Sequence, residues 1–369
     1  MNTVDLTFCL KGAQPVFLRD TVMYLATKAV RRLPPSVSHR LAIKILKYDL
    51  LPHPVLKFDC LSNNLWGINF SNPVGMSAGF DKECEAVNGL FGMAFGFVET
   101  GTVTPEPQPG NPAPNLFRLE EDRALINWLG FPSRGLEKFS DRLERTVKIR
   151  KGPTGANIGI NAKTTDPLED IAKCAERLSN HADYLVVNVS CPNTPGLIEW
   201  QTPRGVERML AVAREACLRA GKRAPILLKL SPDLEMYNLE PIVSSSLNAG
   251  VSGLIISNTT VSRPSELLSE NSVKCGGLSG VPLASLSHKM LCCVSKITSG
   301  SIPLIAAGGI SSSQDAYDRI RSGASLIQIY TALIYRGPQL VAEIVNGLAR
   351  LLKSDGFSSI SEAVGVNYC

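Results

Sequence analysis

Short apolar segments recur along the chain from residue 71 onward, and each ends in glycine or in a cluster of polar residues. We predict eight strands from them: 72–79, 95–103, 155–161, 184–190, 226–231, 253–259, 303–309 and 326–332. Between most of these strands, apolar residues recur at helical spacing, for example in 168–182 and 205–221. Continuous apolar strands that alternate with helices are typical of a parallel sheet covered on both faces. Eight such units predict an α/β protein with a closed (β/α)8 barrel, the TIM-barrel fold.

Segments outside these units define the rest of the predicted organisation. Two long connections, 104–153 and 260–302, are expected to pass over one mouth of the barrel. Residues 1–15 carry no clear structural signal, residues 16–52 predict a helical hairpin, and residues 53–369 are expected to form the barrel domain. With 369 residues, 44% of them hydrophobic, the chain is long enough to bury a large core.

The predicted hairpin concentrates positive charge. Residues 16–52 hold seven basic and two acidic residues, so this segment accounts for the formal net charge of +5. Pro34 and Pro35 are expected to separate two short helices, and Ser36 or Ser38 to start the second. Apolar residues share one face of each helix, which fits either packing on the barrel or an amphipathic hairpin lying on a membrane. A nucleic-acid surface would fit the charge, but no nucleic-acid-binding motif accompanies it.

Composition argues against several other classes of protein. The ten cysteines are scattered without a CxxC pair and the chain has four histidines, so we expect reduced thiols and no metal site. No stretch approaches the roughly 18 to 20 uncharged apolar residues of a membrane-spanning helix. The N-terminal residues resemble neither a secretory signal nor an Arg/Ser-rich transit peptide. Any membrane contact is therefore expected to be peripheral.

Polar residues gather at the carboxyl ends of the predicted strands, where (β/α)8 barrels keep their active sites. Gly308 and Gly309 follow the seventh strand and precede a helix that Ser312 or Ser313 would cap, and a second small-residue loop lies at 276–280. Glycine lets the backbone approach a ligand, and a helix N-terminus offers free N–H groups to an anion. The arrangement predicts a phosphate site, although an ordinary turn would also use two glycines.

Lys229 lies within the otherwise apolar strand segment ILLKLS, where an unpaired ammonium would be costly. One interpretation is an ion pair inside the barrel. The other is a fixed cation that faces an anionic ligand such as a reduced flavin, and Lys82 repeats the pattern at the end of the first strand. Two lysines and several asparagines without metal ligands favour an organic cofactor that has many hydrogen-bonding edges.

Six motifs occur in order along the chain: MSAGFDK, FVETGTVTPEPQPGNPAPNLFRLEEDRALINWLGF, NVSCPNTPGL, SNTTVSRP, GGLSG and GASLIQIYTAL. Together they resemble the dihydroorotate dehydrogenase family, flavin enzymes of pyrimidine biosynthesis, from about residue 35 to the C-terminus. In detail they are similar to the membrane-associated, quinone-reducing class. The resemblance implies a (β/α)8 barrel that binds FMN at the carboxyl ends of its strands, in agreement with the pattern of polar residues.

The resemblance also implies roles for individual residues. FMN would be bound by Ser77, Ala78, Gly79, Gly101, Thr102, Asn127, Asn157, Asn188, Lys229, Ser257, Ser279, Gly280, Gly308, Gly309, Tyr330 and Thr331. Dihydroorotate or orotate would be held by Lys82, Asn127, Asn188, Asn193, Asn258 and Thr259. An amide side chain offers both a donor and an acceptor, which suits a flat imide ring.

In this family a base removes a proton from C5 of dihydroorotate while hydride leaves C6 for the flavin. Cys191 occupies the base position, and Thr194 and Phe131 match positions that shape the proton path. The quinone-linked class normally has serine there and the soluble class has cysteine, so this chain combines the thiol of one class with the framework of the other. A free thiol titrates near ~8.5, and a cationic or helix-end setting lowers such a pKa, but the sequence leaves the pKa of Cys191 itself open.

A second departure from the family is Pro132, where asparagine is usual in the loop that covers the substrate. Proline removes an amide side chain and a backbone N–H from that loop. The resemblance therefore leaves the opening of the loop and the substrate affinity undetermined.

The electron acceptor is implied by the N-terminal hairpin. In the quinone-linked class this hairpin forms a tunnel that delivers ubiquinone to the flavin, and His39, Arg118 and Tyr330 fall on positions that line it. Arg118 also has a plainer interpretation, surface pairing with Glu120 or Glu121.

Peripheral attachment through residues 16–52 would place the protein on the mitochondrial inner membrane of a eukaryote or the inner membrane of a bacterium. Two rival functions remain at this point. One is another FMN-dependent barrel oxidoreductase that acts on a different unsaturated ring. The other is a non-catalytic membrane-bound relative, in which Cys191 and Pro132 would mark decay.

Overall fold

The computed structural model describes residues 23–194 and 196–367. The predicted segment 1–15 and the first part of the predicted hairpin, residues 16–22, lie outside the described residues.

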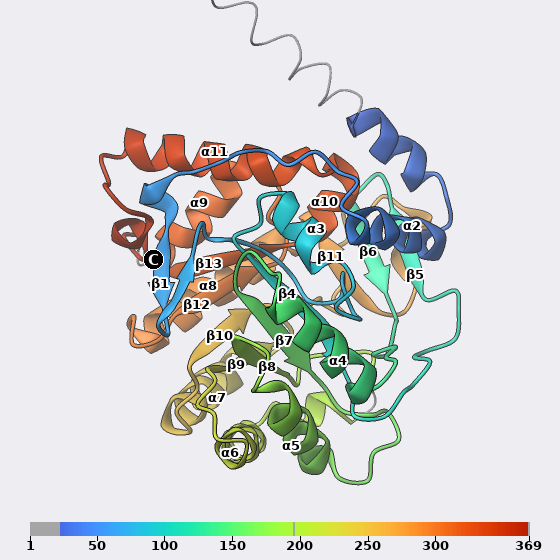
Figure 1. Ribbon diagram of the computed structural model, residues 1–369, viewed down its shortest axis with the longest axis vertical. Coiled ribbons are helices and arrows are strands. Elements are labelled where there is room, and N and C mark those ends of the chain that lie inside the picture. Colours follow the sequence, from blue (N-terminus) through green and yellow to red (C-terminus); the bar gives the residue numbers. More distant parts are fainter. Residues whose placement is uncertain (1–22, 195, 368–369) are drawn as a thin grey trace, which may run out of the picture.

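Eight parallel strands form a closed barrel at the centre of the molecule (Figure 1). They are β3 (Val74–Met76), β4 (Phe97–Val103), β7 (Thr154–Ile158), β8 (Tyr184–Asn188), β9 (Ile226–Leu230), β10 (Gly253–Ile256), β12 (Leu304–Ala307) and β13 (Ala324–Ile329). Their order around the barrel is their order along the chain, and β13 pairs with β3 to close it. Each of the eight predicted segments overlaps one of these strands, so the predicted (β/α)8 barrel is confirmed.

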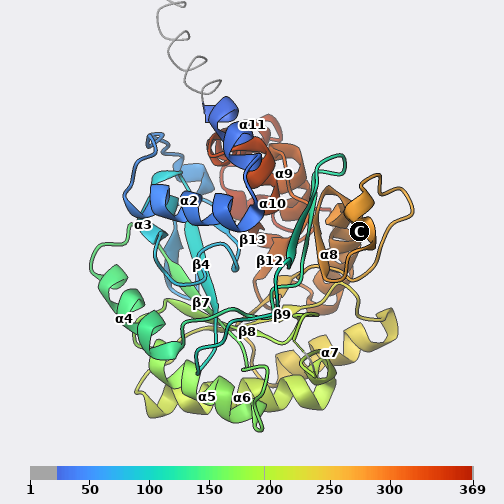
Figure 2. The ribbon, with the colours of Figure 1, turned by 90° about the vertical axis from the view of Figure 1, so that its right-hand side faces the viewer.

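Helices cover the outside of the barrel, and Figure 2 shows α5, α6 and α7 along one side of it. The helices after the hairpin are α3 (Val87–Gly92), α4 (Leu136–Val147), α5 (Pro167–Leu178), α6 (Pro203–Arg219), α7 (Met236–Asn248), α8 (Ala284–Thr298), α9 (Ser313–Arg321), α10 (Thr331–Arg336) and α11 (Gln339–Ser354). α5 and α6 lie where helical spacing predicted them. The side chains of Asp166 and Thr202 accept backbone N–H groups in the first turns of these two helices, so each helix begins at a polar cap.

The amino-terminal end of the barrel is closed by apolar side chains. Phe97, Tyr184 and their neighbours form a fully buried cluster inside it, and Trp66 packs against this cluster from below. Gly75 and Gly155 leave room for the rings of Phe97 and Tyr184, because a Cβ at either glycine would overlap them. The chain turns around Trp66 in a small antiparallel hairpin, β1 (Asn63–Leu65) and β2 (Ile68–Phe70). Ligands therefore reach the barrel from its carboxyl end.

The two long connections meet over the carboxyl mouth, as predicted, but they also form a sheet that the sequence pattern did not reveal. Its antiparallel strands are β5 (Leu116–Leu119), β6 (Ala124–Asn127) and β11 (Gly277–Gly280). Asn127 lies opposite both Leu116 and Gly277, so the pairing joins segments about 150 residues apart in the chain. This sheet forms one wall above the barrel.

Residues 23–31 are helical and are followed by α2 (Pro35–Lys47), which gives the two predicted N-terminal helices. The prediction that Ser36 or Ser38 starts the second helix is wrong, because Pro34 is the N-cap and no side chain caps the first turn. A proline in the first turn has no N–H that would need a cap. The buried hydroxyl of Ser38 instead donates to the carbonyl of Val30 at 2.8 Å, which ties the two helices together.

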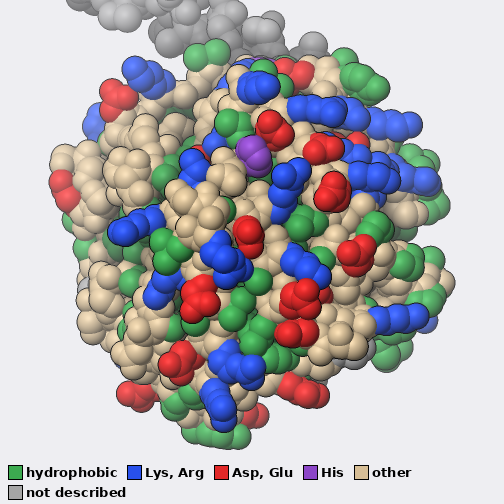
Figure 3. Space-filling view, turned by 60° about the horizontal axis from the view of Figure 1, so that its bottom comes forward, with side chains coloured by type: hydrophobic (Ala, Val, Ile, Leu, Met, Phe, Trp, Pro, Cys, Tyr) green, Lys and Arg blue, Asp and Glu red, His purple; other side chains and the backbone are tan. Residues whose placement is uncertain are grey.

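Within the described part of the chain, no helix combines the length and apolar character that crossing a membrane requires. On the face at the bottom of Figure 1, acidic and basic side chains lie next to one another (Figure 3). The excess of positive charge in the N-terminal segment is therefore a local feature, as its sequence predicted.

Candidate active site

A cavity of about 190 Å³ opens at the carboxyl mouth of the barrel. The predicted cofactor residues that line it are Ser77, Ala78, Gly79, Thr102, Asn127, Asn188, Lys229, Ser257, Ser279, Gly280, Gly308, Gly309, Tyr330 and Thr331. All six predicted substrate residues line it as well, namely Lys82, Asn127, Asn188, Asn193, Asn258 and Thr259. Cys191 and Phe131 also border this barrel cavity, whereas Gly101, Asn157 and Thr194 lie outside its lining.

The predicted phosphate site lies at the start of α9. Gly308 and Gly309 leave β12 with φ values of 107° and 72°, and a Cβ at Gly309 would overlap the backbone of Ala284, where α8 begins. The hydroxyl of Ser312 accepts the N–H of Asp315 at 3.1 Å, so the predicted serine cap of α9 is confirmed. The glycine turn brings backbone N–H groups close to two helix N-termini, an arrangement that suits an anionic group.

Two lysines border the cavity, of which Lys229 is buried and Lys82 is half-buried. Nζ of Lys229 donates to the hydroxyl of Ser77 at 3.4 Å, and Nζ of Lys82 donates to the carbonyl of Gly79 at 2.5 Å. Burial lowers the pKa of Lys229, an effect that the negative charge of Glu99 opposes, and burial lowers the pKa of Lys82 to about 8. Hydroxyl and carbonyl partners leave the positive charge of both groups available to an anionic ligand.

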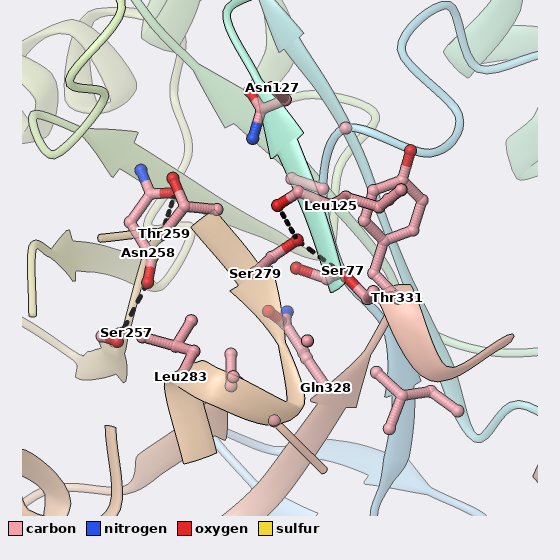
Figure 4. A pocket seen from close by; sticks show the side chains of 18 of the residues that line it. Ser77, Leu125, Asn127, Ser257, Asn258, Thr259, Ser279, Leu283, Gln328 and Thr331 are labelled. Atoms are coloured by element: carbon pink, nitrogen blue, oxygen red, sulfur yellow. Dashed lines mark hydrogen bonds between the residues drawn. The ribbon is translucent and has the colours of Figure 1, made fainter. Parts of the chain in front are cut away.

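Asparagine side chains from several elements converge on the same space. Asn188 ends β8. Asn127 ends β6 and Asn258 follows β10, and Figure 4 shows these two side chains at the cavity. Nδ2 of Asn193 donates to Oδ1 of Asn127 at 3.1 Å, and Nδ2 of Asn258 donates to the hydroxyl of Ser190 at 2.9 Å. These bonds fix the amides before any ligand arrives, which favours recognition of a flat ring with alternating donors and acceptors.

Cys191 lies three residues after β8, and its side chain is 7% exposed. The hydroxyl of Thr194 donates to its Sγ at 3.7 Å. Burial raises the pKa of the Cys191 thiol above its ordinary value, although the backbone N–H of Asn193, the hydroxyl of Thr194 and the charge of Lys229 partly offset this. Desolvation thus outweighs the effect of the nearby cation on this thiol. The thiol is protonated at neutral pH.

The loop that carries Phe131 and Pro132 is anchored by a glutamine. Nε2 of Gln108 donates to the carbonyl of Phe131 at 2.8 Å. Ser133, the residue after Pro132, exchanges two backbone hydrogen bonds of 2.9 Å with Gln108. Proline thus occupies a position whose N–H the loop does not need, and Pro132 itself lines the cavity.

A second cavity of about 200 Å³ lies between the N-terminal helices and the barrel. Most of its lining is apolar and includes Met23, Ala26, Val30, Ala42, Ile45, Leu46, Leu51, Phe80, Met93, Leu333 and Ile334. His39, Arg118 and Tyr330, the residues predicted for a quinone tunnel, also line this apolar cavity. Tyr330, Leu116 and Leu125 border both cavities and therefore form their common wall.

A short series of aromatic rings leads from the apolar cavity to that wall. The ring of His39 meets Phe80 edge-on at 5.5 Å, and Phe80 meets Tyr330 edge-on at 5.7 Å. Burial, assisted by the positive charge of Lys82, lowers the pKa of His39 to about 3. His39 is therefore neutral at physiological pH.

Arg118 connects the barrel domain to the bend between the two N-terminal helices. Its Nη1 donates to the carbonyls of Arg31 at 2.7 Å and Leu33 at 2.8 Å, and its Nη2 donates to the hydroxyl of Ser38 at 3.0 Å. Glu120 pairs with Arg31 at 3.1 Å. In the described structure Arg118 thus holds backbone carbonyls of the hairpin, and the plainer surface pairing is not what its guanidinium does.

Several residues next to the cavity were not predicted. Glu99 and Gln328 are buried inside the barrel. The other polar side chains of their strands, Thr100 and Thr102 in β4 and Ser325 in β13, made them less conspicuous than Lys229 in β9. Arg263 donates to carbonyls at both ends of the loop between Thr259 and Gly277, and only its place in the motif SNTTVSRP pointed to it. Arg319 of α9 is buried, and its guanidinium donates to the carbonyl of Ala284 at 2.7 Å, beside the glycine turn.

Across residues 23–194 and 196–367, no three His, Cys, Asp or Glu side chains are grouped so as to hold a metal ion. No disulfide joins the cysteines of this part of the chain, among them the adjacent Cys292 and Cys293 of α8.

The sequence model of the dihydroorotate dehydrogenase family matches residues 60–352. Dihydroorotate dehydrogenase (quinone) of Xanthobacter autotrophicus is 46% identical over 349 residues, which cover 91% of this chain and 96% of that protein. The mitochondrial dihydroorotate dehydrogenase (quinone) of Mus musculus is 43% identical, with 94% and 90% covered. Among solved structures, DHODH from Eimeria tenella in complex with ferulenol has a TM-score of 0.88 at 37% identity, covering 90% of this chain and 96% of that chain. The chain therefore belongs to the dihydroorotate dehydrogenase family, in its quinone-dependent class.

Proposed function

We propose that the chain oxidises dihydroorotate to orotate in the barrel cavity, with FMN as the hydride acceptor, and passes the electrons to a quinone in the apolar cavity. The oxidation of dihydroorotate with a quinone, a step of pyrimidine biosynthesis, is the reaction of this class. One observation carries the assignment of residues. Cys191 is a buried thiol that borders the cavity among the converging asparagines and near Lys229.

The barrel cavity suits FMN on three counts. The glycine turn at Gly308 and Gly309 presents backbone N–H groups to a phosphate, and Lys229 offers a cation to the anionic edge of the flavin. Gln328 lines the cavity, and its Oε1 is buried and has no hydrogen-bond partner among the described residues, so it would be available to accept a ring N–H. When bound, FMN would accept the hydride that leaves C6 of dihydroorotate.

The remaining steps belong to side chains of the chain. The asparagine amides would hold the imide edge of the pyrimidine, while Lys82 would balance its carboxylate. Cys191 would take the proton from C5, which requires that the thiol has first lost its own proton. The hydroxyl of Thr194, which already donates to Sγ, is placed to relay that proton, and the ring of Phe131 would keep water from the thiol.

The apolar cavity suits the head and the first part of the tail of ubiquinone. His39 and Tyr330 supply polar groups to a lining that is otherwise mostly apolar, and Arg118 borders the same cavity. Because Tyr330 belongs to both cavities, a quinone there would lie one side chain away from the flavin. This proximity would allow electrons to cross the common wall.

We propose further that residues 16–52, of which 23–52 are described, rest on a membrane while residues 53–369 form the catalytic domain. Leu46 of this hairpin packs into the barrel core, whereas other large apolar side chains of it are exposed: Tyr24, Leu25, Leu33, Val37, Leu41, Tyr48 and Leu50. Exposed basic residues accompany them: Lys28, Arg32, Arg40, Lys44 and Lys47. Each would add about 1 kcal/mol of attraction to an anionic membrane. The membrane would be the mitochondrial inner membrane in a eukaryote, the organelle named for the mouse relative, or the inner membrane of a bacterium.

Replacing the thiol tests the proposal. We expect Cys191→Ala to slow flavin reduction by dihydroorotate by about 10²–10⁴-fold, the usual contribution of a general base, while FMN stays bound. Stopped-flow absorbance of the flavin measures this directly. Cys275→Ala, which removes an exposed thiol, is the matched control and should bleach at the normal rate.

Three results would contradict the proposal. Fast bleaching of the Cys191→Ala protein would remove the base assignment. Bleaching of the native protein by another dihydro-ring compound but not by dihydroorotate would favour a different FMN barrel. A purified protein that neither contains nor takes up FMN would favour the non-catalytic relative.

A further inference from the structure

Glu99 is a carboxylate in the middle of β4 whose side chain is fully buried inside the barrel. It lies two residues after Phe97, which belongs to the apolar cluster that closes the lower barrel. Gln328 on β13 lies two residues after Leu326 of the same cluster. Since side chains two apart on a strand point to the same face, both polar groups stand directly above the apolar cluster, on the side of the cavity.

The carboxylate of Glu99 accepts two amide hydrogen bonds. Nδ2 of Asn157 donates to one oxygen at 2.8 Å, and Nε2 of Gln328 donates to the other at 2.5 Å. In both bonds the amide is the donor, so each amide turns its NH2 group toward Glu99 and its carbonyl oxygen away. Glu99 therefore fixes the orientation of two amides that would otherwise be free to flip.

The outward oxygen of Gln328 reaches the barrel cavity. The side chain lines this cavity, and its Oε1 is buried without a hydrogen-bond partner among the described residues. Figure 4 shows the side chain of Gln328 among those that line this cavity, together with Ser77 and Ser279. A buried acceptor without a partner is costly, so a ligand with an N–H at this point would be favoured.

The outward oxygen of Asn157 starts a relay toward the substrate residues. It accepts Nδ2 of Asn188 at 3.1 Å, and Oδ1 of Asn188 in turn accepts the hydroxyl of Ser190 at 3.0 Å. The oxygen of Ser190 then accepts Nδ2 of Asn258 at 2.9 Å. Each bond specifies the direction of the next, so the orientation set at Glu99 extends to two of the amides proposed to hold the pyrimidine.

We infer that Glu99 is a positioning residue that sets the hydrogen-bonding polarity of the barrel cavity. Through Gln328 it presents an acceptor to an N–H of the flavin ring, and through Asn157 it orients the amides that face the pyrimidine. This inference rests on the proposed function and assigns that function two further residues, Glu99 and Gln328. The nearby ammonium of Lys229, which senses the charge of Glu99, adds an electrostatic link to the flavin.

The direct test is Glu99→Gln, which keeps the shape of the side chain but removes its charge and replaces one acceptor oxygen with a donor. One of the two amides would then face another NH2 group and would have to turn. We expect the Kd of the apoprotein for FMN, measured by quenching of flavin fluorescence, to rise about tenfold. The midpoint potential of the bound flavin should become more positive, because a negative charge has been removed from its surroundings.

Glu106→Gln is the matched control, since Glu106 is an exposed carboxylate in the connection after the same strand. It should leave the Kd for FMN and the potential unchanged. A Glu99→Gln protein with the native Kd and potential would overturn the inference. If instead the native protein fails to bind FMN, or binds it but is not bleached by dihydroorotate, the proposed function fails and the inference fails with it.

Two further variants test the inference if Glu99→Gln does not fold. They act separately on the path from Glu99 through Gln328 and on the path through Asn157. Gln328→Leu removes the unpaired acceptor and should weaken FMN binding about tenfold without changing the KM for dihydroorotate. Ser190→Ala breaks the relay and should raise that KM while the Kd for FMN stays constant. If Gln328→Leu binds FMN normally, or if Ser190→Ala leaves the KM unchanged, the assignment is wrong.

Discussion

The barrel cavity and the apolar cavity are similar in size but opposite in character. The first, of about 190 Å³, has amides, hydroxyls, glycines and two lysines among its apolar side chains, whereas the second, of about 200 Å³, is lined mostly by apolar side chains with a few polar ones such as His39 and Arg118. Leu116, Leu125 and Tyr330 separate them. The contrast indicates that the barrel cavity selects a charged ring by hydrogen bonds. The apolar cavity instead accepts a hydrophobic molecule, whose binding is favoured because apolar surface is removed from water.

The two cavities also differ in how they are built. The barrel cavity takes its polar groups from strand ends, which the closed sheet holds in place. The apolar cavity depends on a hairpin that Arg118 and Ser38 attach to the barrel domain through a few hydrogen bonds. Substitutions on the two sides should therefore affect different half-reactions, and the predictions below test this separation from the largest expected effect to the smallest.

Changing the thiol to a hydroxyl should act on the barrel cavity alone. The base acts in its deprotonated form, so the rate of flavin reduction should rise with pH as Cys191 loses its proton. Because burial raises the pKa of Cys191, this rise should occur at a higher pH than for a free thiol. Cys191→Ser is expected to retain measurable activity at neutral pH, reduced by about 10²-fold, with this rise displaced to still higher pH. The pH dependence of the stopped-flow rate measures the displacement, and a rise at the native position would contradict the role of Cys191.

Filling the apolar cavity should act on quinone alone. Ala42→Phe places a ring in the lining, and we expect the rate of flavin reoxidation by a ubiquinone analogue to fall at least about tenfold, since even a modest overlap in a packed site costs 1–3 kcal/mol. Leu41→Phe, at the exposed neighbouring position, serves as the control. Equal loss in both variants would show that the helix surface, and not the cavity, governs reoxidation.

Releasing the hairpin should have a smaller effect on the same half-reaction. Arg118→Met removes three hydrogen bonds from a charged donor, each worth about 1.5–3 kcal/mol at most. We therefore expect faster hydrogen exchange in residues 23–47 and a several-fold higher KM for quinone. Arg40→Met, which replaces an exposed arginine of the same hairpin, is the control for these two measurements. Unchanged exchange would mean that packing of α2 alone holds the hairpin.

The smallest effect concerns pH on the quinone side. Burial lowers the pKa of His39 to about 3, so the histidine stays neutral when the pH falls through 6.5. The rate of flavin reoxidation should therefore not change near pH 6.5 through protonation of His39. His39→Phe should leave the shape of the pH profile unchanged. A change in rate near pH 6.5 that disappears in the variant would show that His39 is charged in the working enzyme.

The fold was predictable because its eight strands are continuous apolar runs, each buried on both sides. The sheet of β5, β6 and β11 was not, because its strands are short and Leu116, Asn127 and Gly277 meet only through long-range pairing. The start of α2 was misjudged for a local reason. Pro35 needs no cap, and the hydroxyl of Ser38 was recruited by the preceding helix.

The candidate site could be predicted as a set of residues but not as a network. The family resemblance gave the lining of the barrel cavity, yet it did not show that Asn157 lies behind the lining or that Glu99 orients it. Register decides which strand residues face one another inside a barrel, and register is not visible in one sequence. The pKa of Cys191 could not be predicted either, because a lysine was visible in the sequence whereas the depth of burial was not.

The central claim is that two cavities separated by one wall carry the two half-reactions. Anaerobic stopped-flow measurements of both half-reactions on Cys191→Ala and Ala42→Phe test it most directly. We predict that Cys191→Ala loses reduction by dihydroorotate but is reoxidised by quinone at the native rate once photoreduced, and that Ala42→Phe shows the reverse. If either variant slows both half-reactions equally, the cavities do not work separately and the account is contradicted.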